Sequence, residues 1–293
     1  MRLTFLGTGS AMPVADRHQT GLLLEPGDES NPGVGSDADE GNGHGNANAG
    51  GDSVPDALDR PLLVDCGAGV LHRLAATDPG YEGVSSVLLT HHHLDHVADL
   101  LPLVKARWLA GETHLEVVGP TGTKALLDGL LDVHSYLEGR VELRVREVAD
   151  GQSFAVAGAD VEAFETRHSM RCLAYRFAGG GPATGAADEG TGALAPGDLV
   201  YSGDSEAFRG LTGFADGASV LVHDCSFPDD VDVSNHPTPS QLGAALAGRE
   251  IDRVYLTHLY PHTEGRHAEM LESVGEAYDG DVRFARDGLT IEV

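Results

Sequence analysis

The stretch from Thr90 to Val97, "THHHLDHV", places four histidines and one aspartate within six consecutive positions. It follows "VSSVLLT" (84–90), an apolar run that predicts a buried strand, and it leads into "VADLLPLVKARWLA" (97–110), where apolar residues recur at helical spacing. The histidines are therefore predicted to lie on a turn from a strand to a helix. Such turns carry exposed functional groups in many mixed folds.

The spacing inside this stretch predicts two pairs of metal ligands. His91 and His93 are two residues apart, so in extended backbone their side chains point the same way, whereas His92 points elsewhere and is not expected to be a ligand. Asp95 and His96 follow at the start of the helix and offer a second pair. Imidazole and carboxylate groups suit zinc, and two neighbouring pairs indicate two neighbouring metal ions.

Two metal ions need further ligands from elsewhere in the chain. Three polar residues follow shortly after apolar runs that predict strands: His168, Asp204 and His258. Each alone could be an ordinary polar residue at a strand end. Together with the first four they complete a set of five histidines and two aspartates that could line one cleft.

Composition indicates a globular chain with an unusually acidic surface. The 293 residues are 41% hydrophobic and carry a formal net charge of −27, and Lys105 and Lys124 are the only lysines among 19 basic residues. This balance predicts a halophilic, haloarchaeal protein, with an ordinary acidic protein as the alternative. A strong negative charge opposes binding of nucleic acid at long range, although molar salt screens that repulsion.

Two segments lack the pattern of a folded core. Residues 27–60 are rich in Gly and acidic residues and predict a disordered surface insertion, and residues 178–197 predict a Gly/Ala-rich loop. The three cysteines form no CxxC pair, no long apolar segment starts the chain, and no run of 18 apolar residues is present. We therefore expect a cytoplasmic protein that does not associate with membranes.

The remaining sequence alternates between short strands and helices. The predicted strands are 2–6, 20–24, 61–65, 86–90, 115–118, 141–148, 152–157, 160–165, 172–177, 199–202, 219–223, 253–257 and 288–292, and the predicted helices are 68–76, 97–109, 121–135, 238–248 and 264–278. Strands follow one another over 141–177 and leave no room for the crossover helices of a doubly wound parallel sheet. Two sheets packed face to face, with helices outside, fit better.

The pattern His91-x-His93-x-Asp95-His96 resembles the H-x-H-x-D-H signature of the metallo-β-lactamase superfamily, and the three later residues match its further ligands in order. The resemblance implies a single α/β domain over 1–293 with a four-layer αββα sandwich. It also implies two divalent metal ions, most simply zinc, with manganese or iron as alternatives. The implied ligands are His91, His93 and His168 for one ion, Asp95, His96 and His258 for the other, and Asp204 as a bridge. Asp95 is also expected to be catalytic.

Four further segments resemble the ribonuclease Z branch of that superfamily and its shorter phosphodiesterase relatives. They are "FLGTGSAMP", "LLVDCGAGV", "RHSMRCLAYRF" and "HDCSF…NHPTPSQLGAALA". The resemblance implies a homodimer, and it implies that His236 donates a proton to the leaving oxygen. The alternative for its segment is a plain helix cap by Thr238 and Ser240. Arg176 could pair with a substrate phosphate.

One departure from the branch bears on the substrate. Ribonucleases Z that process tRNA precursors carry a long arm between the third and fourth metal motifs, whereas His168 and Asp204 here are 36 residues apart. The loop between them has no basic residue from 178 to 197, although an arm that grips RNA should be basic. We therefore expect a metal-dependent phosphodiesterase that acts on a nucleotide or another small phosphodiester. A tRNA 3′-processing endoribonuclease, a lactonase or other ester hydrolase, and a metal-bearing binding protein without activity remain alternatives.

Overall fold

The computed structural model describes residues 1–27, 58–179 and 197–293. Most of the predicted insertion 27–60 and most of the predicted loop 178–197 lie outside these residues. The predicted boundary of the insertion is wrong at its end, because Leu58 is 4% exposed and belongs to the main hydrophobic core. The backbone N–H of Asp59 also donates to the carbonyl of Ala157. The folded chain therefore resumes before residue 60.

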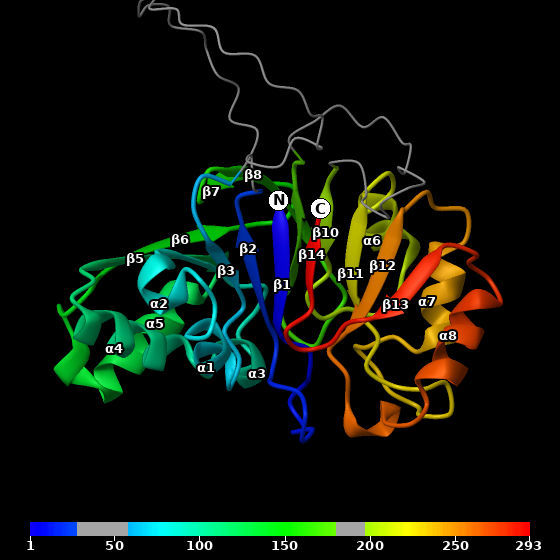
Figure 1. Cartoon of the computed structure of the whole chain (residues 1–293), viewed down its shortest axis with the longest axis horizontal. Helices are drawn as coiled ribbons and strands as arrows, with labels where there is room; N and C mark the ends of the chain where they lie inside the picture. The colour runs from blue at the N-terminus through cyan, green and yellow to red at the C-terminus, as the bar shows by residue number, and fades with distance from the viewer. Residues whose placement is uncertain (28–57, 180–196) are drawn as a thin grey trace, which may run out of the picture.

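The described strands form two seven-stranded sheets that face each other (Figure 1). The first sheet has the order β14 (Thr290–Glu292), β1 (Arg2–Gly7), β2 (Gly21–Glu25), β3 (Leu62–Val64), β4 (Ser86–Leu88), β5 (His114–Pro120) and β6 (Glu142–Val148). The second sheet has the order β13 (Asp281–Phe284), β12 (Arg253–Thr257), β11 (Val220–Asp224), β10 (Leu199–Tyr201), β9 (Leu173–Phe177), β8 (Ala159–Glu165) and β7 (Ser153–Val156).

Helices cover the outer face of each sheet. Against the first sheet lie α1 (Val70–Leu74), α2 (Gly80–Gly83), α3 (Leu94–Val97), α4 (Leu100–Ala110) and α5 (Thr123–Val133), and against the second lie α6 (Arg209–Phe214), α7 (Pro239–Leu246) and α8 (His267–Gly275). One apolar cluster fills the space between the sheets, and one further cluster lies under each helical layer. This confirms the predicted αββα sandwich. None of the described helices is long and apolar enough to cross a membrane.

Each predicted strand and helix has a counterpart, but β13, α2, α6 and the short helix η2 (Pro261–Thr263) were not predicted. Among the described strands, β13 pairs only with β12, and it is largely half-exposed, so its sequence does not show a clear apolar pattern. Helices α2 and α6 have four and six residues, too few to show helical periodicity. The predicted helix 97–109 is divided at Asp99, whose carboxylate accepts the backbone N–H groups of Gly69 and Leu71 at the start of α1.

The topology brings several strand ends to one end of the sandwich. Strands β3 and β4 run parallel in the first sheet, and β10, β11 and β12 run parallel in the second. The carboxyl ends of these strands lie at the same end of the molecule as α3 (Figure 1). The described residues that flank the two undescribed segments lie at the other end, because β2 and β9 run antiparallel to β3 and β10. Polar residues that follow the parallel strands can therefore meet at one edge.

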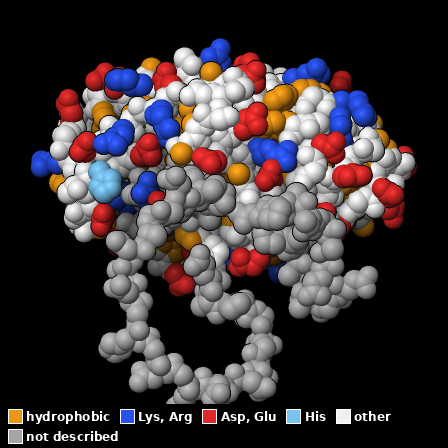
Figure 2. Space-filling model, turned by 90° about the horizontal axis from the view of Figure 1, so that it is seen from above, with side chains coloured by type: hydrophobic (Ala, Val, Ile, Leu, Met, Phe, Trp, Pro, Cys, Tyr) orange, Lys and Arg blue, Asp and Glu red, His pale blue; other side chains and the backbone are white. Residues whose placement is uncertain are grey.

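Charges of both signs are spread over the surface. Figure 2, which shows the molecule from above relative to Figure 1, has Asp and Glu side chains interspersed with Lys and Arg. Among the described residues, several exposed arginines pair with neighbouring carboxylates, for example Arg283 with Asp281 at 2.8 Å. Exposed pairs of this kind contribute less than about 1 kcal/mol each.

Arg107 on α4 is an exception, because its side chain is fully buried and is bonded to three backbone carbonyls, two in α2 and one in β5. Its guanidinium donates to the carbonyls of Tyr81, Glu82 and His114 at 2.7, 2.9 and 3.0 Å. We expect Arg107→Met to lower the free energy of unfolding by about 3 kcal/mol, because it leaves buried carbonyls without donors. Chemical denaturation measures this loss, and Arg283→Met, at an exposed position, is the matched control. Equal midpoints for the two variants would contradict the assignment.

Candidate metal centre

The opening histidines lie where the chain leaves β4 and enters α3. The backbone of His93 is still extended, and α3 begins at the next residue, so Asp95 and His96 belong to its first turn. Nε2 of His91 lies 3.0 Å from Nδ1 of His93. His92 turns away from them, as predicted, and its Nε2 lies 2.8 Å from Oγ1 of Thr123 at the start of α5.

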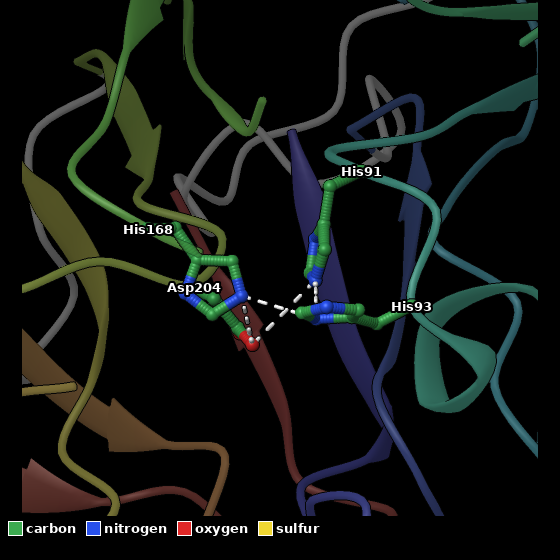
Figure 3. A group of neighbouring side chains, drawn as sticks. All are labelled: His91, His93, His168 and Asp204. Carbon is green, nitrogen blue, oxygen red and sulfur yellow. Dashed lines mark hydrogen bonds and ion pairs between the residues drawn. The ribbon is translucent and has the colours of Figure 1, made fainter. Parts of the chain in front are cut away.

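A first group of ligand atoms is formed by His91, His93, His168 and Asp204, each of which offers one atom that lies within 4.8 Å of the others. Figure 3 shows the three imidazoles turned toward one another with the Asp204 carboxylate beside them. Nε2 of His168 lies 3.1 Å from Nδ1 of His93. Oδ2 of Asp204 lies 3.6 Å from Nε2 of His91 and 3.8 Å from Nε2 of His168.

A second group is formed by Asp95, His96 and His258. Oδ2 of Asp95 lies 3.1 Å from Nε2 of His258 and 3.9 Å from Nε2 of His96. Asp204 reaches this group too, since its Oδ1 lies 3.3 Å from Nε2 of His96 and its Oδ2 lies 3.3 Å from Nε2 of His258. The structure thus brings together all seven residues that the sequence indicated as ligands, with Asp204 between the two groups.

Hydrogen bonds within this cluster leave some of its buried polar atoms without a partner, and metal ions would satisfy these atoms. Nε2 of His96 and Oδ1 of Asp204 are buried and have no hydrogen-bond partner among the described residues. An unsatisfied buried group costs about 1–3 kcal/mol, which a cation between the two groups would offset. Burial, together with the neighbouring His96, lowers the pKa of His91 well below its usual range. Its imidazole is therefore neutral, which is the form that binds metals.

Asp65 is a residue of the centre that the sequence interpretation missed. Its Oδ2 lies 2.8 Å from Nδ1 of His96, and the carboxylate also accepts hydrogen bonds from Thr90 and from the hydroxyl of Tyr201. This contact keeps the proton of His96 on Nδ1, so Nε2 faces the other ligands. The signal was present, because Asp65 directly follows the apolar strand β3, just as the proposed ligands follow theirs.

Asp224 is the second residue that was missed. It ends β11, is fully buried, and holds Nδ1 of His236 at 2.7 Å from its Oδ2. Burial lowers the pKa of His236, but the carboxylate of Asp224 more than offsets this and raises the pKa to about 9. The half-buried His236 ring lies 5.2 Å from those of His168 and His258. His236 therefore adjoins both groups of ligand atoms.

The segment after His236 also caps a helix. Thr238 is the N-cap of α7 and forms a capping box with Gln241, whose side chain accepts the Thr238 N–H at 3.0 Å. The hydroxyl and N–H of Ser240 are bonded to Asp229. Capping therefore accounts for Thr238 and Ser240, whereas it does not involve His236.

Arg176 does not join the centre, which corrects the prediction that it pairs with a substrate phosphate. Its guanidinium forms an ion pair with Asp198 and donates to the carbonyls of Phe214 and Asp216 at 2.7 and 3.2 Å. Side chains alternate along a strand, and the neighbouring Tyr175 already points between the sheets, where its hydroxyl donates to Leu89. Arg176 therefore points to the outer face of the second sheet.

The role of Asp65 leads to a prediction about metal affinity. We expect Asp65→Asn to weaken metal binding about 10- to 100-fold, the usual effect of losing a partner that orients a ligand. Competition with a chromogenic chelator measures the affinity, and circular dichroism checks that the variant is folded. Asp128→Asn, at an exposed position on α5, is the control. An Asp65→Asn protein that binds metal like the wild type would show that Asp65 does not orient His96.

Comparison with known proteins agrees with this geometry. The profile of the β-lactamase superfamily domain matches residues 60–259. The ribonuclease Z of Methanopyrus kandleri is 30% identical to the chain, over 99% of the chain and 97% of the relative, and that of Haloferax volcanii is 26% identical, over 100% and 95%. The crystal structure of the metallo-β-lactamase fold protein YhfI from Bacillus subtilis superimposes with a TM-score of 0.70 at 22% identity, covering 100% of this chain and 99% of that one.

A fold of two facing sheets with a His/Asp cluster at one edge thus defines the class of protein. The chain belongs to the β-lactamase superfamily, and within it to the ribonuclease Z family. It is accordingly a metal-dependent hydrolase.

Proposed function

We propose that the protein is a phosphodiesterase with two divalent metal ions, most simply zinc, that acts on a nucleotide or another small phosphodiester. His91, His93 and His168 would hold one ion and Asp95, His96 and His258 the other. The observation that carries the proposal is the position of Asp204, whose two carboxylate oxygens reach both groups of ligands. Manganese and iron accept the same ligand types.

The two ions would supply charge and activate water. When bound by these residues, a pair of divalent ions would make a nearby water more acidic and would offset the negative charge that develops in an in-line displacement. Within the chain, Asp95 would be catalytic as well as a ligand. Its Oδ2 is 3.1 Å from Nε2 of His258, so the carboxylate is held at the second group, where it can orient the attacking water and accept its proton.

His236 would act as the general acid. Asp224 holds the Nδ1 atom of its ring, and no hydrogen bond to Nε2 is formed within the described part of the chain. Nε2 can then donate its proton to the leaving alkoxide, whose basicity makes a proton donor necessary. An acid fixed by a buried carboxylate beside a cluster of cation ligands suits the cleavage of an ester with a poor leaving group.

The length of the chain between two ligands favours a small substrate. His168 and Asp204 are 36 residues apart, and residues 178–197 contain no basic side chain that could bind the RNA backbone. A second candidate is tRNA 3′ processing. It is favoured by relatives named ribonuclease Z that match this chain over nearly its whole length.

A panel of substrates tests the proposal. We expect the metal-loaded protein, in molar salt, to hydrolyse bis(p-nitrophenyl) phosphate and a nucleoside 2′,3′-cyclic phosphate, and Asp95→Ala to abolish both activities. Cleavage of a tRNA precursor at its 3′ end would favour the second candidate. Hydrolysis of lactones alone would make the protein a lactonase. Metal binding without any hydrolysis would indicate a binding protein. Hydrolysis of lactones alone and metal binding without hydrolysis would each refute the proposed phosphodiesterase activity.

We extend the proposal to domain organisation, assembly and location. Both sheets contribute ligands to the centre and share one core, which supports a single domain over 1–293. Cys66, Cys172 and Cys225 are all free and buried, which suits the reducing cytoplasm. We expect a homodimer, as the resemblance to the ribonuclease Z branch implies. Size-exclusion chromatography with light scattering measures the oligomeric state.

A further inference from the structure

The centre is more accessible from one side than from the other. His93, His236 and Tyr260 are half-buried and reach the surface, whereas the side chain of His168, which is also a half-buried residue, is only 1% exposed. The buried residues of the centre are Asp65, His91, Asp95, His96, Asp204, Asp224 and His258. A substrate therefore approaches the centre over the three half-buried side chains, and two of these already have proposed roles. Tyr260 is the third, and the mechanism above does not use it.

Tyr260 is part of a wall of aromatic rings beside the general acid. Its ring centroid lies 5.8 Å from that of His258 and 5.9 Å from that of His236. It stacks on Phe227 with 4.3 Å between centroids and 29° between planes, and Phe227 is in turn 5.3 Å from the exposed His262. We refer to Phe227, Tyr260 and His262 as the aromatic wall.

The aromatic wall is fixed by the same backbone that fixes the catalytic side chains. The N–H of Tyr260 donates to the carbonyl of Ser226 at 3.4 Å. The hydroxyl of Ser226 donates to Oδ1 of Asp224 at 2.6 Å and lies 2.9 Å from Nδ1 of His258. The carbonyl of Tyr260 accepts the hydroxyl of Thr263 at 2.8 Å. These bonds hold the backbone of Tyr260, and the stack on Phe227 positions its ring before a substrate arrives, which lowers the entropic cost of binding.

The contacts of Tyr260 indicate that its ring is available to pack against a ligand. Its hydroxyl has no hydrogen bond to any described residue, so the side chain is not held by its polar end. Aromatic side chains stack on nucleobases of any identity, because each base presents a flat π-face. In the proposed mechanism, His236 protonates the leaving oxygen of the substrate. Because the aromatic wall adjoins His236, it lies next to the leaving group that carries this oxygen.

We propose that Tyr260 binds the nucleobase of the substrate by stacking, so that the protein prefers a nucleotide over an aliphatic phosphodiester. This inference rests on the proposed phosphodiesterase function and narrows its substrate class. The phosphate lies at the metal centre and the base lies against the Tyr260 ring. Tyr260 is then a specificity-determining residue, and Phe227 supports it from behind.

Binding measurements test the inference separately from catalysis. Isothermal titration calorimetry of the zinc-loaded protein is carried out with AMP and with methyl phosphate, which share a phosphate but differ in the base. We expect AMP to bind more tightly than methyl phosphate. Tyr260→Ala should weaken AMP about tenfold, within the range of base stacking on an aromatic ring, and should leave methyl phosphate unchanged. Tyr260→Phe should retain the preference.

Tyr136→Ala is the matched control, because Tyr136 is 50% exposed on the short helix η1 (Ser135–Leu137), away from the centre. Equal weakening of both ligands by Tyr260→Ala, or an equal loss for AMP in Tyr260→Phe and Tyr260→Ala, would overturn stacking by the ring. AMP binding no tighter than methyl phosphate would overturn the inference and leave the phosphodiesterase intact. Failure of both ligands to bind, with no diester hydrolysed, would overturn both proposals.

Discussion

Asp204→Ala should lower turnover on the order of a thousandfold, the upper part of the range for removing one preorganised electrostatic group. Asp204 is 1% exposed and lies within 3.3–3.8 Å of four imidazoles from both groups. Burial raises the pKa of Asp204, but His258 and His96 outweigh burial and hold the pKa well below its usual range. The variant therefore removes a permanent negative charge from the centre of a cluster of cation ligands.

The effect of Asp204→Ala can also be measured as a change in metal content, independently of turnover. Elemental analysis should find about two metal ions per wild-type chain and fewer in Asp204→Ala, because both groups share this carboxylate. Asp216→Asn, at a half-exposed position paired with Arg249, is the control and should keep both activity and metal. Asp204→Ala protein with full metal content and near-normal turnover would show that the two groups do not share Asp204.

His236→Ala should slow turnover about 10²- to 10⁴-fold, the contribution of a general acid, and should leave metal content unchanged. The reason is that Nδ1 of His236 is bound to Asp224, whereas the seven proposed ligands do not include this ring. Steady-state kinetics on the nucleoside 2′,3′-cyclic phosphate, whose leaving alkoxide is strongly basic, and elemental analysis separate the two effects. A His236→Ala protein that loses metal would make His236 a ligand, and one with normal turnover would rule out general acid catalysis by this residue.

Asp224→Asn provides a pH test of the same role. A general acid works while it is protonated, so activity should persist below its pKa and fall as the pH rises through it. Asp224 raises the pKa of His236 to about 9, so removing the carboxylate should move this fall to lower pH. A pH–rate profile of wild type and variant measures the shift, and coincident profiles would contradict the role of Asp224.

Local patterns in the sequence predict much of this fold. Strands such as β2 and β11 are fully buried, so their apolar runs identify them directly. The consecutive strands β6 to β9 predict two sheets, because antiparallel neighbours need only short connections. The edge strand β13 is missed because it is partly exposed and so lacks that signal.

The centre is predictable where its residues are types that bind metals. The seven proposed ligands do lie together, and their role as ligands stays a prediction. Asp65 and Asp224 were missed because each is a single aspartate at or just after the end of a strand, and their partners, His96 and His236, are 31 and 12 residues away. Arg176 was wrongly predicted to lie at the centre. Local sequence does not show which residues of β9 point between the sheets and which point to the outer face.

The central claim is that Asp204 lies between two metal ions. Anomalous X-ray diffraction from crystals of the zinc-loaded protein, measured at the zinc absorption edge, tests it most directly. We predict two peaks roughly 3.5–4 Å apart, one beside His91, His93 and His168 and the other beside Asp95, His96 and His258, with Asp204 in contact with both. A single peak, or two peaks of which one is out of reach of Asp204, would contradict the claim.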